Sequence, residues 1–168
     1  MSATTALRTP LRHYGISLGH LTEQAAELWV RSLGLPDAAQ ACLHRDDLPF
    51  PHVAISVALP AGSSLPLTAV GQAFAEAAGR ACAAHASGRS GRAVHFRGSS
   101  LPVGLLTVAA LRDRTEIVRV TDGDRPAQPD DPLDPGHRLT PHWIDGELTL
   151  RTARRPDGVL APAPRFGW

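Results

Sequence analysis

Residues 64–88, SLPLTAVGQAFAEAAGRACAAHASG, form the longest helical pattern in the C-terminal two-thirds of the chain. Its polar side chains recur every four residues and predict one narrow stripe along the helix, made of Thr68, Gln72, Glu76 and Arg80. Nearly every other position is alanine, glycine or an apolar residue, and a helix that is apolar on almost all sides is usually buried. The pattern predicts a long helix from Leu65 to Gly88 that is enclosed by a sheet, with only its stripe exposed.

The composition is that of a soluble globular protein. The chain has 168 residues, which suits a single domain over 1–168, and its hydrophobic share of 43% is enough to build a core. The net charge is +1, and the 17 basic residues, all arginine, are interspersed with acids, which argues against a nucleic-acid partner. We find no signal peptide and no apolar run of the roughly 20 residues needed to cross a bilayer. A cytoplasmic protein without a membrane partner is expected.

The N-terminal third is expected to be helical. Residues 1–15 are polar and predict a mobile arm, and residues 16–48 predict an N-terminal helical segment. Within it, apolar residues from Leu21 to Leu33 follow helical spacing. A second, short helix is expected to begin at Pro36 and to end near residue 42, because proline suits the first position of a helix.

Residues 49–153 are expected to form an α+β core around the long helix. His52 to Leu59 alternates between larger and smaller apolar side chains, as a strand does, and further strands are expected over 92–97, 103–112 and 115–121. A last hairpin should pair 137–143 with 147–153 across Asp145 and Gly146, which suit a type I′ turn. Residues 122–136 predict a loop, and residues 154–168 an extended tail that ends in aromatic residues.

The summed elements predict an α+β fold in which an antiparallel sheet wraps one long apolar helix. This element order, over about residues 50 to 153, resembles the hotdog architecture. A ferredoxin-like sandwich and the trimeric fold of small chorismate-mutase-like proteins are the alternatives that the same order leaves open.

Glu76 and His52 are the candidate catalytic residues. Glu76 is the only acid between Asp47 and Asp113, and a carboxyl group among apolar residues can work as an acid or a base. In hotdog dehydratases a histidine works with an acid of the central helix, so the resemblance implies His52 and Glu76 as the analogous pair. The alternative is that Glu76 forms an ordinary surface pair with Arg80 four residues later.

Other polar residues complete the hypothesis. The candidate substrate contacts are Gln72, Arg80 and His95. The segment SGRSGRAVHF has a passing likeness to an anion-binding loop through Arg89 and Arg92, and a plain turn between helix and strand is the preferred interpretation.

Metal and cofactor sites are not expected. The motifs HExxH and CxxC are absent, as are a P-loop and a dinucleotide fingerprint, so the sequence predicts no metal and no cofactor. Cys42 and Cys82 are expected to be small buried residues rather than a disulfide or a zinc site.

Two functions remain open from the sequence. The first is a hotdog-like homodimer, or another homo-oligomer, that binds or processes an acyl thioester carried by CoA or an acyl carrier protein, as a thioesterase or dehydratase. The second is a non-catalytic accessory or assembly subunit that binds protein partners through its N-terminal arm and C-terminal tail.

Overall fold

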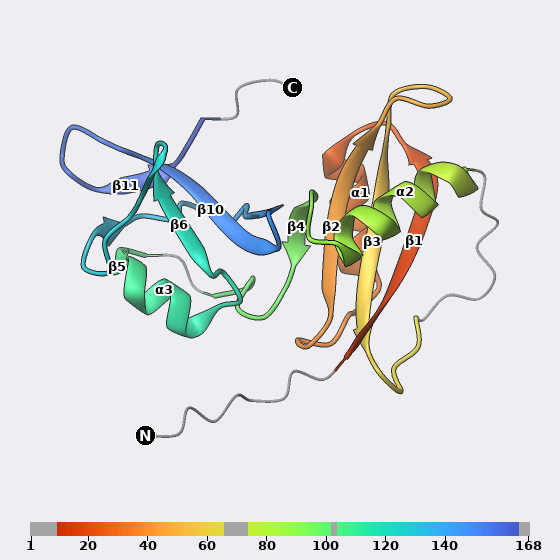
Figure 1. Ribbon diagram of the computed structural model, residues 1–168, viewed down its shortest axis with the longest axis horizontal. Helices are drawn as coiled ribbons and strands as arrows, with labels where there is room; N and C mark the ends of the chain where they lie inside the picture. Colours follow the sequence, from red (N-terminus) through yellow and green to blue (C-terminus); the bar gives the residue numbers. More distant parts are fainter. Residues whose placement is uncertain (1–9, 66–73, 102–103, 165–168) are drawn as a thin grey trace.

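The protein has an α+β fold in which helices pack against one large sheet (Figure 1). The computed structural model describes residues 10–65, 74–101 and 104–164. Within these ranges, eleven strands join in a single sheet and three helices cover parts of it. The molecule has two halves, and β4 lies between them in Figure 1.

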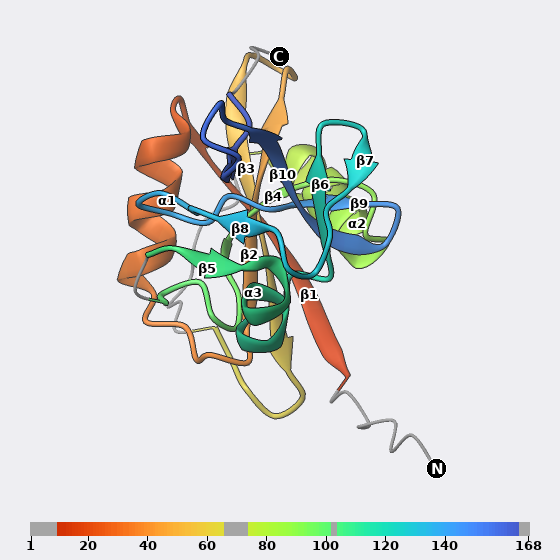
Figure 2. The same ribbon diagram turned by 90° about the vertical axis from the view of Figure 1, so that its left-hand side faces the viewer.

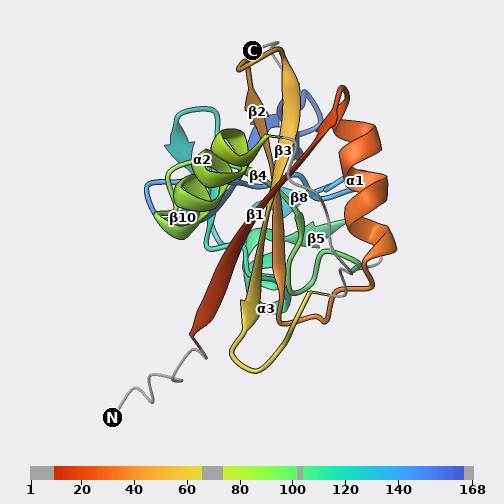
Figure 3. The same ribbon diagram turned by 90° about the vertical axis from the view of Figure 1, so that its right-hand side faces the viewer.

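The N-terminal half is an antiparallel sheet with the strand order β1-β3-β2-β4. Its elements are β1 (Leu11–His20), α1 (Glu23–Ser32), β2 (Gln40–Asp46), β3 (His52–Pro60), α2 (Ala75–Ala86) and β4 (Arg92–His95). Figure 3 shows α1 and α2 on opposite sides of the strands. The sheet is therefore covered by a helix on each face.

The sequence of β3 explains why both faces are covered. Val53, Ile55 and Val57 share one cluster with the apolar side of α1, and the alternate residues, including Ala54, contact α2. Small residues let α2 approach the sheet closely. A Cβ on Gly15 of β1 would lie 2.6 Å from the carbonyl carbon of Ala78 in α2, and closer still to its oxygen.

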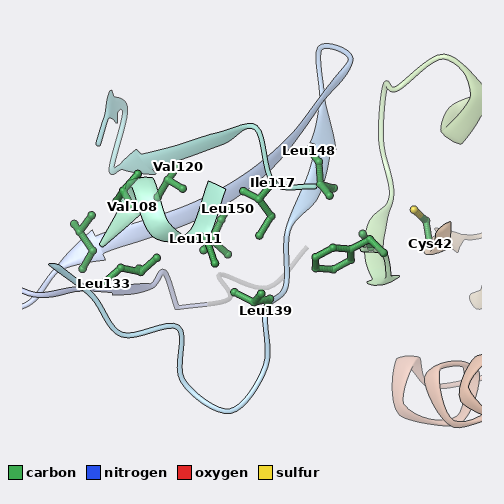
Figure 4. Packing of buried hydrophobic residues seen from close by; sticks show 12 residues of the cluster. Cys42, Val108, Leu111, Ile117, Val120, Leu133, Leu139, Leu148 and Leu150 are labelled. Carbon is green, nitrogen blue, oxygen red and sulfur yellow. The ribbon is translucent and has the colours of Figure 1, made fainter. Parts of the chain in front are cut away.

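The C-terminal half is built around a β-hairpin and a short helix (Figure 2). Its elements are β5 (Leu106–Thr107), α3 (Val108–Arg114), β6 (Arg119–Asp122), β7 (Arg125–Pro126), β8 (Pro132–Leu133), β9 (His142–Ile144), β10 (Glu147–Arg154) and β11 (Leu160–Pro162). Figure 4 shows its core, where Leu111 of α3 lies among leucine, isoleucine and valine side chains of the strands and loops. Cys42 of β2 belongs to the same cluster, so the two halves share buried contacts.

Several predicted elements are confirmed, and the strands expected over 92–97 and 115–121 correspond to β4 and, in part, to β6. The helix after Leu21 is α1, which Thr22 caps by accepting from the Ala25 amide at 3.1 Å. The strand from His52 is β3, and the last hairpin is β9–β10. Its turn residues Asp145 and Gly146 have φ angles of 50° and 79°, as a type I′ turn requires.

Within the described residues, the prediction for the N-terminal third is wrong at β1 and β2, and residues 1–9 of the expected arm lie outside the described ranges. Residues 11–20, expected as the end of an arm and the start of a helical segment, form β1, which pairs with β3. Residues 40–46, which overlap the end of the second helix expected from Pro36 to about residue 42, form β2 between β3 and β4. Pairing with strands that are distant in the sequence outweighs the local helical signal in both places.

The C-terminal half differs from prediction at three places. The strand expected over 103–112 is instead β5 followed by α3, which Thr107 caps at the Ala110 amide. The predicted loop at 122–136 contains β7 and β8. The tail that was predicted to be extended contains β11, whose Leu160 is fully buried. β6 pairs with β10, and β8 with β11, in the parallel direction rather than the expected antiparallel one.

The long enclosed helix is not shown. The described helix α2 covers Ala75–Ala86, and residues 66–73, which include Thr68 and Gln72 of the predicted stripe, lie outside the described ranges. Because α1 and α2 occupy opposite faces of the sheet, the described structure shows no sheet wrapped around a single helix.

Candidate functional site

A cleft of about 440 Å³ lies where the two halves meet. It falls within the range of about 300 to 1,000 Å³ that is usual for small-molecule sites. Its walls come from the start of α1, the loop between α2 and β4, the β9–β10 hairpin and the end of β11. The side chains that matter most for its chemistry are Arg89, Arg92, His142, Trp143 and Arg151.

The loop from Gly88 to Arg92 is fixed by backbone contacts with the hairpin. The Gly146 amide donates to the Gly88 carbonyl at 3.0 Å, and a Cβ on Gly88 would lie only 2.6 Å from the Gly146 Cα. The Trp143 amide donates to the Gly91 carbonyl at 3.0 Å. The absence of a side chain at Gly88 thus lets the loop and the hairpin approach closely enough to form one wall of the cleft.

Arg92 is the buried cation of the cleft. Its side chain is only 8% exposed, and it forms ion pairs with Glu23 at 3.2 Å and with Glu27 at 3.4 Å, both on α1. Glu27 also pairs with Arg31 and Arg138. These carboxylates hold Arg92 in place and offset its charge.

Arg89 and Arg151 differ from Arg92 because no carboxylate among the described residues pairs with either of them. The Arg89 Nε donates to the Ser87 hydroxyl at 2.8 Å. The Arg151 guanidinium has no hydrogen-bond or ion-pair partner within the described ranges. The cleft therefore carries two cations whose charge the described protein groups leave uncompensated.

The rest of the lining is largely apolar. Trp143, Ile144, Ala163 and Pro164 supply an aromatic and aliphatic surface. Burial, and then the neighbouring guanidiniums, lower the pKa of His142 below its usual value, which disfavours the charged ring. A surface of this kind suits a ligand that has an apolar body and an anionic group.

A second polar cluster lies between α2 and the sheet and forms a continuous chain of hydrogen bonds. His44 Nε2 lies 2.7 Å from Ser56 Oγ, and Ser56 Oγ lies 2.8 Å from His85 Nδ1. His85 Nε2 lies 3.0 Å from Gln40 Oε1, and Gln40 Nε2 donates to Glu116 at 3.1 Å. The chain thus reaches from the N-terminal sheet to the C-terminal half.

The hydrogen-bond partners assign a direction to this chain. Gln40 offers its carbonyl oxygen to His85, so His85 Nε2 carries the proton and Nδ1 accepts from the Ser56 hydroxyl. Ser56 Oγ then accepts from His44 Nε2. Every donor points toward Glu116, and the polar groups of the chain satisfy one another.

Burial keeps the histidines of this chain neutral. It lowers the pKa of His85 to about 3, with the charges of His13 and His44 acting in the same direction, and it lowers the pKa of His44 to about 4. Burial also raises the pKa of the Cys42 thiol to about 12. Cys42 is a buried free thiol, as the sequence predicted, and Cys82 is half-buried and also free.

The hydrogen-bonded serines are structural. Ser56 has an exposed fraction of zero, and its hydroxyl is already shared between two histidines. Ser17 is buried too and lies 3.0 Å from His52 Nε2, while His52 Nδ1 lies 2.7 Å from the Phe50 carbonyl. A substrate carbonyl cannot reach either serine in this packing, so these groups stabilise the fold rather than form a nucleophilic site.

The sequence-predicted catalytic residues lie apart from the cleft. The Glu76 side chain is 94% exposed, and its carboxylate is 4.0 Å from Arg80. Arg80 forms two hydrogen bonds with Asp46, at 2.8 and 2.9 Å, which tie α2 to the β2–β3 hairpin. His52 is buried against Ser17, as described above, rather than against Glu76.

The remaining predicted contacts are likewise dispersed. His95 Nε2 lies 2.9 Å from the Pro36 carbonyl, and Gln72 lies outside the described residues. The segment SGRSGRAVHF, with its likeness to an anion-binding loop, does contribute Arg89 and Arg92 to the cleft lining. The sequence did not indicate the other lining residues Arg151, His142 and Trp143. These three are brought to the loop by strand pairing that no local pattern reports.

Neither a cluster of metal ligands nor a membrane-crossing helix is present among the described residues. Residues 10–65, 74–101 and 104–164 contain no group of three histidine, cysteine or acidic side chains placed to hold a metal ion. Among the helices of those same ranges, none combines the length and the apolar character of a membrane-crossing segment.

The chain was compared with family models, with curated proteins and with solved structures, and none of the three comparisons found a match.

Proposed function

We propose that the protein binds a small molecule with an apolar body and a carboxylate or phosphate group in the cleft between its two halves. The observation that carries this proposal is that two guanidiniums without a carboxylate partner among residues 10–65, 74–101 and 104–164, those of Arg89 and Arg151, line the same cleft as Trp143. Arginine is well suited to such anions because its planar group can donate two parallel hydrogen bonds to one carboxylate or phosphate.

The geometry also separates the roles of the three arginines. Arg92 is buried and held by Glu23 and Glu27, so it supports the wall of the cleft. Arg151 is exposed and lies on β10, beside the apolar residues of the hairpin. We assign to Arg151 the first contact with the anion and to Trp143 the contact with the apolar body.

Isothermal titration with 2-naphthoate tests this proposal. The wild-type protein should bind 2-naphthoate, while neutral 2-naphthol should bind much more weakly. Arg151→Gln should weaken naphthoate binding by about ten- to hundredfold, because one charge-assisted contact is lost. Arg125→Gln, which removes an exposed arginine of β7 that is not part of the cleft lining, is the matched control and should bind like the wild type.

Equal affinity of Arg151→Gln and Arg125→Gln would contradict the assignment. So would binding of 2-naphthol as tightly as 2-naphthoate, because the cleft would then recognise only the apolar body.

An acyl thioester, the hotdog-type ligand expected from the element order, is a second candidate. It is compatible with the same cleft because CoA carries phosphate groups that the arginines can bind. In this variant of the proposal CoA should compete with 2-naphthoate, and Glu76→Gln should leave any thioester hydrolysis intact, since Glu76 is exposed. Failure of CoA and of both naphthyl ligands to bind would favour the other sequence-based hypothesis, a non-catalytic subunit that binds protein partners.

A further inference from the structure

We propose that His142 is the ligand-responsive residue of the cleft, which takes up a proton as the anion binds and thereby adds a third cationic contact. This inference rests on the proposed function and goes beyond it, because it links the affinity for the anion to the protonation of one residue.

The position of His142 places it among the charges that meet in the cleft. In the register of the sheet, the Cα of His142 lies opposite the Cα of Arg92 in β4 and opposite that of Thr149 in β10. The charged groups that act on its ring come from three elements and are Glu23 of α1, Arg92 of β4 and Arg151 of β10. A hydrogen bond with the Thr140 backbone also acts on it.

The balance of these groups disfavours a charged ring before an anion binds. Burial and the two guanidiniums lower the pKa of His142, and Glu23 and the Thr140 backbone oppose them. A bound carboxylate near Arg151 would offset the guanidinium charge and attract the imidazolium directly. Both changes favour the protonated ring, so binding of the anion and of the proton should reinforce each other.

This coupling predicts that affinity rises as the pH falls. Each proton taken up can increase the association constant by at most about tenfold per pH unit. The aromatic carboxylate 2-naphthoate is a suitable probe because carboxyl groups titrate near pH 4, so its own charge is constant between pH 6 and 8.

The experiment is a titration of 2-naphthoate into the full chain at pH 6, 7 and 8, in buffers with different heats of ionisation. The wild-type association constant should increase about three- to thirtyfold from pH 8 to pH 6, with uptake of up to one proton. In His142→Gln the pH dependence and the proton uptake should disappear. His137→Gln, which removes an exposed histidine that is not part of the cleft lining, should behave like the wild type.

The NMR titration of His142 in the wild-type protein gives a second readout that does not depend on how the variant folds. Saturating 2-naphthoate should raise the pH at which the His142 ring signal titrates. Binding that is independent of pH, or a His142 signal that titrates at the same pH with and without ligand, would overturn this inference while leaving the proposed function standing. Absence of naphthoate binding at every pH would overturn this inference, and absence of CoA binding as well would overturn the proposed function.

Discussion

Ser56 shows how this protein keeps polar side chains in its interior. Its hydroxyl bridges His44 and His85, and Gln40 then connects His85 to Glu116. Leaving any of these buried groups without its partner would cost about 1 to 3 kcal/mol, which explains why the chain of hydrogen bonds is complete. The same arrangement depends on neutral histidines.

The neutral state of His44 and His85 predicts instability in acid. Their folded-state pKa values, about 4 and about 3, lie below the ordinary 6.5, so the unfolded chain binds protons first as the pH falls. The contribution of these two residues to the free energy of unfolding is fully present above about pH 6.5. Below that pH, the contribution of each residue should fall by about 1.4 kcal/mol per pH unit until its folded-state pKa is reached. Urea unfolding at pH 7, 6 and 5 measures this loss.

The controls for this prediction are two histidine variants. His85→Gln should have a smaller slope of stability against pH than the wild type, whatever its stability at pH 7, because the histidine with the most strongly lowered pKa is removed. His137→Gln, at an exposed site, should keep the wild-type slope. A wild-type protein that is equally stable at pH 7 and pH 5 would contradict the account of the buried chain.

At the scale of elements, the packing of α2 on β1 depends on the absence of a side chain at Gly15. An added Cβ would overlap the carbonyl group of Ala78, which is backbone and cannot move without displacing the helix. Gly15→Ala should therefore destabilise the protein by about 2 kcal/mol or more. Thermal and urea unfolding of the purified variant provide the measurement.

The matched control lies on the helix itself. Gly79 is exposed on α2, and a Cβ there would have no atom within 4 Å, so Gly79→Ala should stabilise the helix by about 0.5 to 1 kcal/mol. If both substitutions had the same sign, close packing of α2 on β1 would be the wrong explanation.

Elements with a strong local signal were the ones that the sequence predicted well. The period of two in β3 and the Asp145–Gly146 turn both correspond to what the structure contains. β2 was missed because Pro36 and the apolar residues after it suit a helix equally well. The conformation of β2 is determined by its two neighbours in the sheet, which are β3 and β4, and β4 lies about 50 residues away in the sequence.

At the scale of the whole molecule, the proposed site exists because two halves that share one sheet also share buried contacts through Cys42. The loop with Arg89 and Arg92 could be proposed from its sequence, since glycine and arginine alternate there. Arg151 and His142 could not, because each looks like an ordinary residue of a hairpin strand. Only the pairing of β9 with β4 brings that hairpin to the loop.

The most direct test follows the indole N–H signals of the protein during a titration with 2-naphthoate. The chain has three tryptophans, Trp143 lines the cleft, and Trp143→Phe assigns its signal. If the cleft is the anion site, the Trp143 signal should move progressively and saturate in the wild type. In Arg151→Gln it should hardly move at the same ligand concentrations. A Trp143 signal that stays in place while naphthoate binds elsewhere would contradict an anion site in this cleft.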